Sequence, residues 1–278
     1  MFRRVFYFFV FSNLFIATCA ALMVYQTCHL LLKTGPDIAF TCFVFFATIC
    51  SYSFHWYLTP STLEASPRIT WLISYRYIHT VFFIIGLAGA IVAGSFVLPH
   101  WPWLVLAAVT TFLYSAPKIP HPWFKKLRKI AVGKTIFLAM TWMYVTTLLP
   151  LLISDHPWRT EFTLFAISRF FLIYAICVLF DYRDREYDKS IGIRSLITWM
   201  GERAIGLLFV LSLLVFAGAT AGMLFSGFSP LIVFILLIPG LITGGLYRYA
   251  INHSHDLLYY FILDGLMALS ALTLLIPG

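Results

Sequence analysis

Long apolar runs are the feature of this sequence that most constrains its fold. The first extends from Val5 to Leu32 with little interruption besides Gln26, and comparable runs follow along most of the chain. A helix that crosses a bilayer needs about 20 mostly apolar residues. Hydrophobic residues make up 61% of the sequence and charged residues 11%, whereas about a quarter of an ordinary soluble protein is charged. The sequence therefore predicts an all-α integral membrane protein and excludes a soluble globular one.

Nine segments have the length and composition expected of membrane spans. They are 5–32, 38–58, 77–98, 101–116, 130–152, 161–180, 204–226, 229–249 and 256–276. No repeat, low-complexity tract or long structureless loop separates them. We therefore expect residues 1–278 to form a single transmembrane domain.

The N-terminal run has two interpretations. Arg3 and Arg4 before an apolar stretch are typical of a secretory signal, and cleavage after Ala20 is conceivable. The run is much longer than the roughly 7–15 apolar residues of a signal peptide. We favour a retained first span.

The basic residues predict the orientation of the chain in the membrane. The net charge is +8, and most of the 19 Lys and Arg lie at the N-terminus or in the links after the even-numbered spans. The opposite side carries Lys33 and Arg159. Because cytoplasmic loops carry an excess of Lys and Arg, we expect a cytoplasmic N-terminus, a bacterial inner membrane and no nucleic-acid partner. The longer, more polar links share this side, so chemistry is expected at the cytoplasmic face.

An acidic segment follows the apolar part of the sixth span. If the helix continues, its rotation of roughly 100° per residue places Asp181, Asp184 and Asp188 on one face, with Arg185 beside them. Clustered carboxylates repel one another unless a cation compensates. Mg²⁺ binds one or two carboxylates and completes its coordination with phosphate oxygens and water. The face is a candidate metal site, and the alternative is a solvated helix end whose acids pair with neighbouring basic residues.

A second polar group, Tyr114 and Lys118, lies at the end of the fourth span and precedes a basic link. The basic residues of such a link typically determine topology and contact lipid head groups. Lys118 differs because its position at the end of a span allows the ammonium to face a cavity and neutralise phosphate charge.

Two charged residues, Arg169 and Asp264, lie near the middle of their predicted spans. Such groups face the bundle interior or a cavity by default. Asp264 either pairs with another span or lines a substrate chamber, and the sequence leaves both open. Arg169 either pairs internally or extends toward the outer membrane surface, which we favour.

These motifs resemble the UbiA superfamily of membrane prenyltransferases. The similarity to the second Asp-rich motif of that family is carried by Asp181-x-x-Asp184-Arg-Glu-Tyr-Asp188-x-x-x-Gly192-x-x-Ser195-Leu196. Tyr114-x-x-x-Lys118 is similar to the YxxxK motif of the family. Nine spans, with long cytoplasmic links after the second, fourth and sixth, match the family over essentially the whole chain. The resemblance implies a UbiA-like bundle of nine transmembrane helices.

The chain departs from the family at the first Asp-rich motif, NDxxDxxxD, which is expected at the end of the second span. Segment 51–64 contains no aspartate, and Glu64 is its only acid. His55 and Arg68 are the polar residues nearest the expected site. One of the two carboxylate sets of the family is therefore missing.

For a typical member, the resemblance implies that Mg²⁺ ions clamp the diphosphate of an allylic prenyl donor, whose prenyl group passes to a hydrophobic acceptor. In this chain it implies one or two Mg²⁺ ions at Asp181, Asp184 and Asp188, and catalytic roles for Tyr114, Lys118 and Asp184. The basic residues expected to bind the diphosphate are Lys118, Arg128, Arg185 and Arg194. Membrane lipid surrounds the protein, and the acceptor, aromatic or lipid, is not specified. The alternative is a catalytically degenerate UbiA-fold protein that binds an isoprenoid lipid or a membrane partner.

Overall fold

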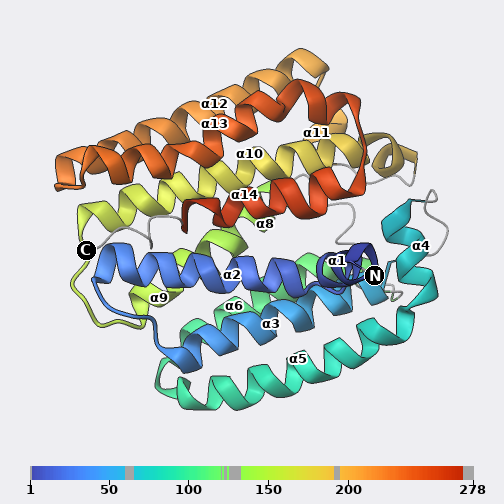
Figure 1. Cartoon of the computed structure of the whole chain (residues 1–278), viewed down its shortest axis with the longest axis horizontal. Coiled ribbons are helices and arrows are strands. Elements are labelled where there is room, and N and C mark those ends of the chain that lie inside the picture. Colours follow the sequence, from blue (N-terminus) through green and yellow to red (C-terminus); the bar gives the residue numbers. More distant parts are fainter. Residues whose placement is uncertain are drawn as a thin grey trace.

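The computed structural model describes residues 2–59, 66–119, 121, 124, 133–190 and 195–271. All secondary-structure elements within these ranges are helical, which confirms the predicted all-α class. Most of the helices run along one common direction and form an elongated bundle (Figure 1).

The first half of the chain contains α1 (Phe2–Phe11), α2 (Leu14–Thr27), η1 (Cys28–Leu32), α3 (Ile38–Tyr57), α4 (Pro67–Ser74), α5 (Arg76–Phe96), η2 (Leu98–His100), α6 (Trp101–Ser115) and η3 (Ala116–Lys118). The second half contains α8 (Lys134–Met143), η5 (Tyr144–Leu148), α9 (Leu149–Leu152), α10 (Thr160–Ser190), α11 (Leu196–Trp199), α12 (Glu202–Gly222), η6 (Met223–Ser226), α13 (Pro230–Asn252), η7 (Leu258–Leu263) and α14 (Asp264–Leu269).

Seven helical segments among the described residues are long and apolar enough to cross a membrane, so the chain is an integral membrane protein. They correspond to seven of the predicted spans. The other two predicted spans, 101–116 and 256–276, correspond to the 15-residue α6 and to the shorter apolar helix Leu258–Leu269. The count of nine spans therefore stays a prediction.

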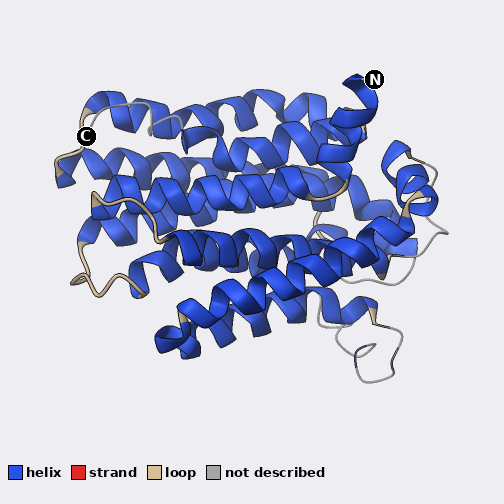
Figure 2. Cartoon of the chain, turned by 60° about the horizontal axis from the view of Figure 1, so that its bottom comes forward, coloured by secondary structure: helices blue, strands red, loops and turns tan. Residues whose placement is uncertain are grey.

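The first predicted span, 5–32, is wrong in its extent, because the backbone bends sharply at Asn13. This residue has a left-handed conformation with φ of 73°, and the membrane-length helix begins after it, at Leu14. Its side chain fixes the bend: Nδ2 donates to Ser53 Oγ at 3.3 Å, and Oδ1 accepts from Arg68 Nη2 at 2.8 Å. As a result, the axis of α1 is not in line with the axis of α2 (Figure 2).

Seven of the helices close a ring through their mutual contacts. In order around the ring they are α2, α3, α6, α8, α10, α13 and α14, and α14 returns to α2. α5 packs on the outside of α3, and α12 packs against α10 and α13. Figure 1 shows α12 and α13 at one edge of the bundle and α5 at the opposite edge. Polar side chains from several ring helices can therefore meet at one end of the ring.

Small residues allow some of these helices to approach closely. A Cβ on Gly86 of α5 would lie 2.6 Å from the backbone nitrogen of Cys50 on α3. A Cβ on Gly240 of α13 would lie 2.1 Å from the ring of Phe216 on α12. Glycine is required at both positions because backbone or an aromatic ring occupies the space.

Candidate functional site

The acidic segment forms the final turns of α10. This helix continues without a break through Asp181, Asp184 and Asp188 to Ser190, as the sequence predicts. Asp181 and Asp188 are 6% and 4% exposed. They lie roughly two turns apart on one side of the helix. Two carboxylates are therefore buried at the same face, where each needs a compensating partner.

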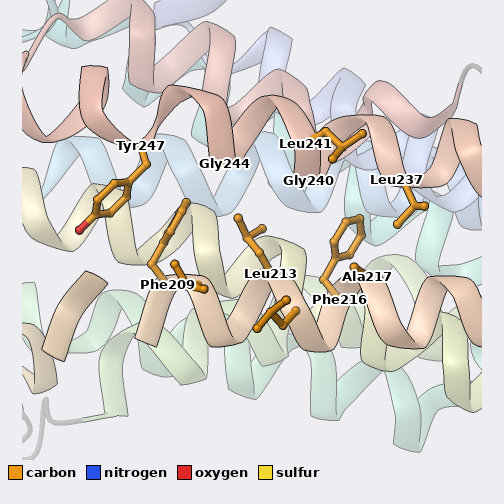
Figure 3. Close-up of a pocket in the computed structure, with 11 residues that line it drawn as sticks. Phe209, Leu213, Phe216, Ala217, Leu237, Gly240, Leu241, Gly244 and Tyr247 are labelled. Carbon is orange, nitrogen blue, oxygen red and sulfur yellow. The ribbon is translucent and has the colours of Figure 1, made fainter. Parts of the chain in front are cut away.

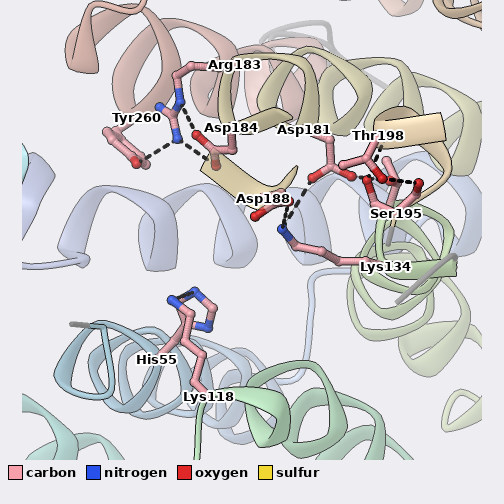
Figure 4. Close-up of polar contacts among 11 residues, drawn as sticks. His55, Lys118, Lys134, Asp181, Arg183, Asp184, Asp188, Ser195, Thr198 and Tyr260 are labelled. Atoms are coloured by element: carbon pink, nitrogen blue, oxygen red, sulfur yellow. Dashed lines mark hydrogen bonds and ion pairs between the residues drawn. The ribbon is translucent and has the colours of Figure 1, made fainter. Parts of the chain in front are cut away.

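That partner is Lys134, the first residue of α8. Its Nζ lies 3.6 Å from Asp181 Oδ1 and 3.6 Å from Asp188 Oδ2. The next residue, Thr135, donates a hydrogen bond from its hydroxyl to Asp181 Oδ2. The close packing of α8 against α10 places the lysine between the two acids (Figure 4). One ammonium group thus bridges both carboxylates.

Asp184 is oriented differently from the other two acids. Arg183 holds both of its carboxylate oxygens, with Nε 2.7 Å from Oδ1 and Nη2 3.3 Å from Oδ2. The same Nη2 donates to the hydroxyl of Tyr260 at 3.0 Å. The expected face of three cooperating carboxylates is therefore divided into a pair, Asp181 and Asp188, and a separate Asp184–Arg183–Tyr260 group (Figure 4).

This arrangement does not fit a bound Mg²⁺ ion. Mg²⁺ requires nearly octahedral coordination by oxygens about 2.0–2.1 Å away. Here the ammonium of Lys134 lies between two of the carboxylates, and a guanidinium holds the third. Within the described ranges, no group of three or more His, Cys, Asp or Glu side chains is arranged to hold a metal ion. A metal could bind the pair only if Lys134 moved away.

The opposite wall of the site is basic and comes from α3, α6 and η3. Lys118 Nζ donates to Nε2 of His55 and to the hydroxyl of Thr59, both at 2.7 Å. His55 Nε2 therefore accepts, which leaves the ring proton on Nδ1, 3.3 Å from Ser115 Oγ. The ring of Tyr114 stacks on His55 with a centroid separation of 5.2 Å. Tyr114 and Lys118 thus join one cluster around His55, which was among the polar residues nearest the missing acidic motif in the sequence.

Arg68 adds a buried positive charge between the two walls. It is 2% exposed, and its guanidinium lies 4.2 Å from the ring centroid of Trp56 and 5.2 Å from that of Tyr260. Nη2 donates to Asn13, and the backbone N–H donates to Asp256 Oδ2 at 2.6 Å. Burial lowers the pKa of Arg68 to about 10, so it remains protonated at neutral pH. Trp56 and Tyr260 also touch each other, with ring centroids 5.6 Å apart.

Of the other residues expected to bind the diphosphate, only Arg185 lies within the described part of the chain. Arg185 donates from Nη2 to the backbone carbonyl of Met200 at 2.6 Å, which ties α10 to the end of α11. Arg128 and Arg194 lie outside the described residues. The residues that the sequence did not single out for the site are Lys134, Thr135 and Tyr260, whereas Arg183 was among the neighbouring basic residues expected to pair with the acids in the alternative interpretation.

Arg169 and Asp264, the charged residues near the middle of their predicted spans, are both buried. Arg169 is 1% exposed and donates to Ser270 Oγ at 2.6 Å, so the expectation that it extends toward the membrane surface is wrong. The reason is that α10 is packed on several sides, by α8, α12, α13 and α14. Asp264 is 9% exposed and lies at the start of α14.

An apolar groove of about 360 Å³ lies elsewhere, between α12 and α13 (Figure 3). Its walls include Phe209, Leu213, Phe216 and Leu237, and Tyr247 lies at one end. None of the acidic or basic residues of the polar site lines it. The groove offers apolar surface and no charged group that could take part in chemistry.

Comparison with known proteins identifies the fold. No family model and no curated protein matches the chain. The structure is similar to the apo structure of a UbiA homolog from Aeropyrum pernix K1, with a TM-score of 0.58 and 12% sequence identity over 96% of this chain and 98% of that chain. The expected UbiA-like fold is thereby confirmed.

Proposed function

We propose that this chain with a UbiA-like fold is a membrane prenyltransferase-like protein, which binds an allylic prenyl diphosphate and transfers the prenyl group to a hydrophobic acceptor. The observation that carries the proposal is the pairing of two polar walls at one end of an apolar bundle: Lys118 with His55, and Lys134 with Asp181 and Asp188. Such an end can hold a charged diphosphate while the prenyl chain lies among apolar side chains. We place this end at the cytoplasmic face, as the distribution of Lys and Arg predicts.

The basic wall can take over the task that the missing acidic motif performs in the family. A diphosphate is an anion that hydrogen-bonded ammonium and guanidinium groups bind directly. Lys118 and the hydroxyl of Tyr114 are the groups we assign to it, and Arg128, Arg185 and Arg194 complete the proposed set. Arg68 adds positive potential from within the bundle. No metal is needed for this contact.

The proposed reaction proceeds by cleavage of the allylic C–O bond. The electron pair stays on the diphosphate oxygen, where Lys118 stabilises the charge that develops. The allylic cation left behind forms a C–C or C–O bond with the acceptor, which then loses a proton. We assign Asp184 as the base that accepts this proton. Its side chain is 40% exposed, whereas those of Asp181 and Asp188 are 8% and 6% exposed. The faces of Trp56 and Tyr260 are suited to stabilise the cation.

A second function is favoured by one specific observation. Each of the three carboxylates of the acidic segment already has a basic partner from the same chain. A site with this internal compensation can bind an isoprenoid lipid or a membrane partner without catalysing any transfer. Binding and transfer must therefore be measured separately.

The test for binding is thermal unfolding of the detergent-purified protein with geranyl, farnesyl or geranylgeranyl diphosphate, compared with inorganic diphosphate. A ligand at a hundred times its dissociation constant stabilises a protein by about 2.7 kcal/mol. We expect a rise in Tm with a prenyl diphosphate and a smaller rise with inorganic diphosphate. No rise with any donor contradicts the proposal.

Transfer is tested by following the release of diphosphate in membranes that contain the protein. Release that requires Lys118 supports a transferase. Binding without release in the presence of a membrane lipid extract favours the non-catalytic alternative. Lys189→Ala is the matched control, because Lys189 lies on the same helix as the acidic segment but pairs with the exposed Glu186.

A further inference from the structure

The pair of buried carboxylates on α10 is bridged by a positively charged group of the chain itself. Lys134 Nζ is equidistant, at 3.6 Å, from an oxygen of Asp181 and an oxygen of Asp188. The two acidic side chains are 8% and 6% exposed and that of Lys134 is 29% exposed, so all three groups are largely shielded from solvent. A cation that bridged these carboxylates would occupy the same space.

The neighbouring contacts hold Lys134 in this place. Thr135 donates to the second oxygen of Asp181, which fixes the start of α8 against α10. Asp184 does not compete for the lysine, because Arg183 holds both of its oxygens. The positive charge at the pair is therefore built into the fold through the contact between two helices.

We propose that Lys134 is a resident cation that occupies the position of a bridging metal ion, so that the site is charged and organised without Mg²⁺. The proposal concerns the same site as the proposed function and explains how that site is organised, but its test needs no prenyl diphosphate. It differs from what the acidic segment by itself suggests, which is a site loaded with Mg²⁺.

A consequence is that removal of the lysine side chain should create a metal site. Without Lys134, two buried carboxylates on one side of α10 have no compensating charge, which strongly favours uptake of a cation. A divalent ion with two carboxylate ligands and water would satisfy them. The expected result is therefore a gain of metal binding by a variant, which simple loss of structure cannot imitate.

The experiment measures Mn²⁺ binding by electron paramagnetic resonance and thermal unfolding with Mg²⁺ or EDTA, on the full chain in detergent. The proteins compared are wild type, Lys134→Ala, Lys134→Met and the control Lys189→Ala. We expect wild type and Lys189→Ala to bind no Mn²⁺ and to show the same Tm with Mg²⁺ and with EDTA. We expect Lys134→Ala to bind Mn²⁺ stoichiometrically, to gain several degrees of Tm with Mg²⁺, and to lose both effects when combined with Asp188→Asn.

Two outcomes overturn the proposal. One is stoichiometric Mn²⁺ binding by the wild-type protein that Asp188→Asn abolishes, since the pair then holds a metal despite the lysine. The other is the absence of binding in both folded lysine variants, since Lys134 then does not occupy a cation position. Lys134→Met retains the apolar length of the side chain and provides a folded protein if the shorter variant is unstable. Failure of prenyl diphosphate to bind affects neither measurement, so the two proposals fail separately.

Discussion

Lys118 Nζ lies 2.7 Å from Nε2 of His55, so a lysine and a neutral histidine form a hydrogen-bonded pair opposite the carboxylates of α10 (Figure 4). Thr59 accepts a second hydrogen bond from the same ammonium. The ammonium of Lys118 gives this wall a positive charge, which attracts anions.

Lys118→Ala is expected to weaken the binding of farnesyl diphosphate. A hydrogen bond to a charged group contributes about 1.5–3 kcal/mol, which is roughly a tenfold to hundredfold change in dissociation constant. Titration by calorimetry or by thermal shift measures this change. Lys189→Ala, which alters an exposed lysine, should bind as wild type does. Equal affinity in wild type and Lys118→Ala would exclude Lys118 as a diphosphate ligand.

The two kinds of acid on α10 are expected to differ in their contribution to stability. Asp181→Asn leaves Lys134 with one carboxylate instead of two and disturbs the hydrogen bond that Thr135 donates to the buried Asp181. Breaking a buried ion pair costs about 3 kcal/mol. Asp184 is 40% exposed at its side chain, so Asp184→Asn should cost about 1 kcal/mol or less.

Unfolding in detergent, followed by circular dichroism, compares these two variants. Glu186→Gln provides the control, because the side chain of Glu186 is 79% exposed. Equal destabilisation by Asp181→Asn and Asp184→Asn would show that the two acids do not differ in the way their burial suggests.

Gly86→Ala is expected to destabilise the contact between α5 and α3. The new methyl group would lie 2.6 Å from a backbone nitrogen and 2.8 Å from a backbone oxygen, so the helices must separate. Overpacking of this kind costs about 1–3 kcal/mol. Gly218→Ala is the control, since nothing lies within 4 Å of its Cβ position, and it should leave Tm unchanged or slightly higher. A normal Tm for Gly86→Ala would mean that α5 moves freely against α3.

Arg169→Leu is expected to leave stability unchanged or to raise it. The guanidinium is 1% exposed, and its Nε and Nη2 have no hydrogen-bond partner in the part of the chain that the structure describes. Burying an ionised group without a charge partner costs several kcal/mol. Ser270 Oγ retains its hydrogen bond to Gln26 when Arg169 is replaced. A fall in Tm would contradict this and would show that the hydrogen bond from Arg169 to Ser270 is worth more than the burial costs.

The bilayer location and most of the helices were predictable because they depend on local properties of the sequence. Apolar length predicts a span wherever it occurs, and α3, α5, α10, α12 and α13 correspond to predicted segments. The bend at Asn13 was not predictable in this way. It depends on hydrogen bonds to Ser53 and Arg68, which lie far along the chain.

The acidic segment itself was also evident, and the structure confirms that it continues the helix of the sixth span. The expected cooperation of three carboxylates was not confirmed, because the helix fixes only the direction in which each side chain starts. Arg183, next in sequence to Asp184, turns that acid toward Tyr260. The hydrogen bonds of the Arg183 guanidinium thus separate Asp184 from the pair formed by Asp181 and Asp188.

The sequence by itself determined that the chain belongs in a bilayer, where most of its long helices lie, and that acids and bases gather near particular helix ends. These properties follow from the transfer of apolar residues into lipid and from helical periodicity, which are local. The tertiary structure alone decided that Lys134 bridges Asp181 and Asp188 and that Arg68 is buried against Trp56. The physical reason is that a buried charge needs a compensating partner. Packing brings that partner from a helix that is distant in the sequence.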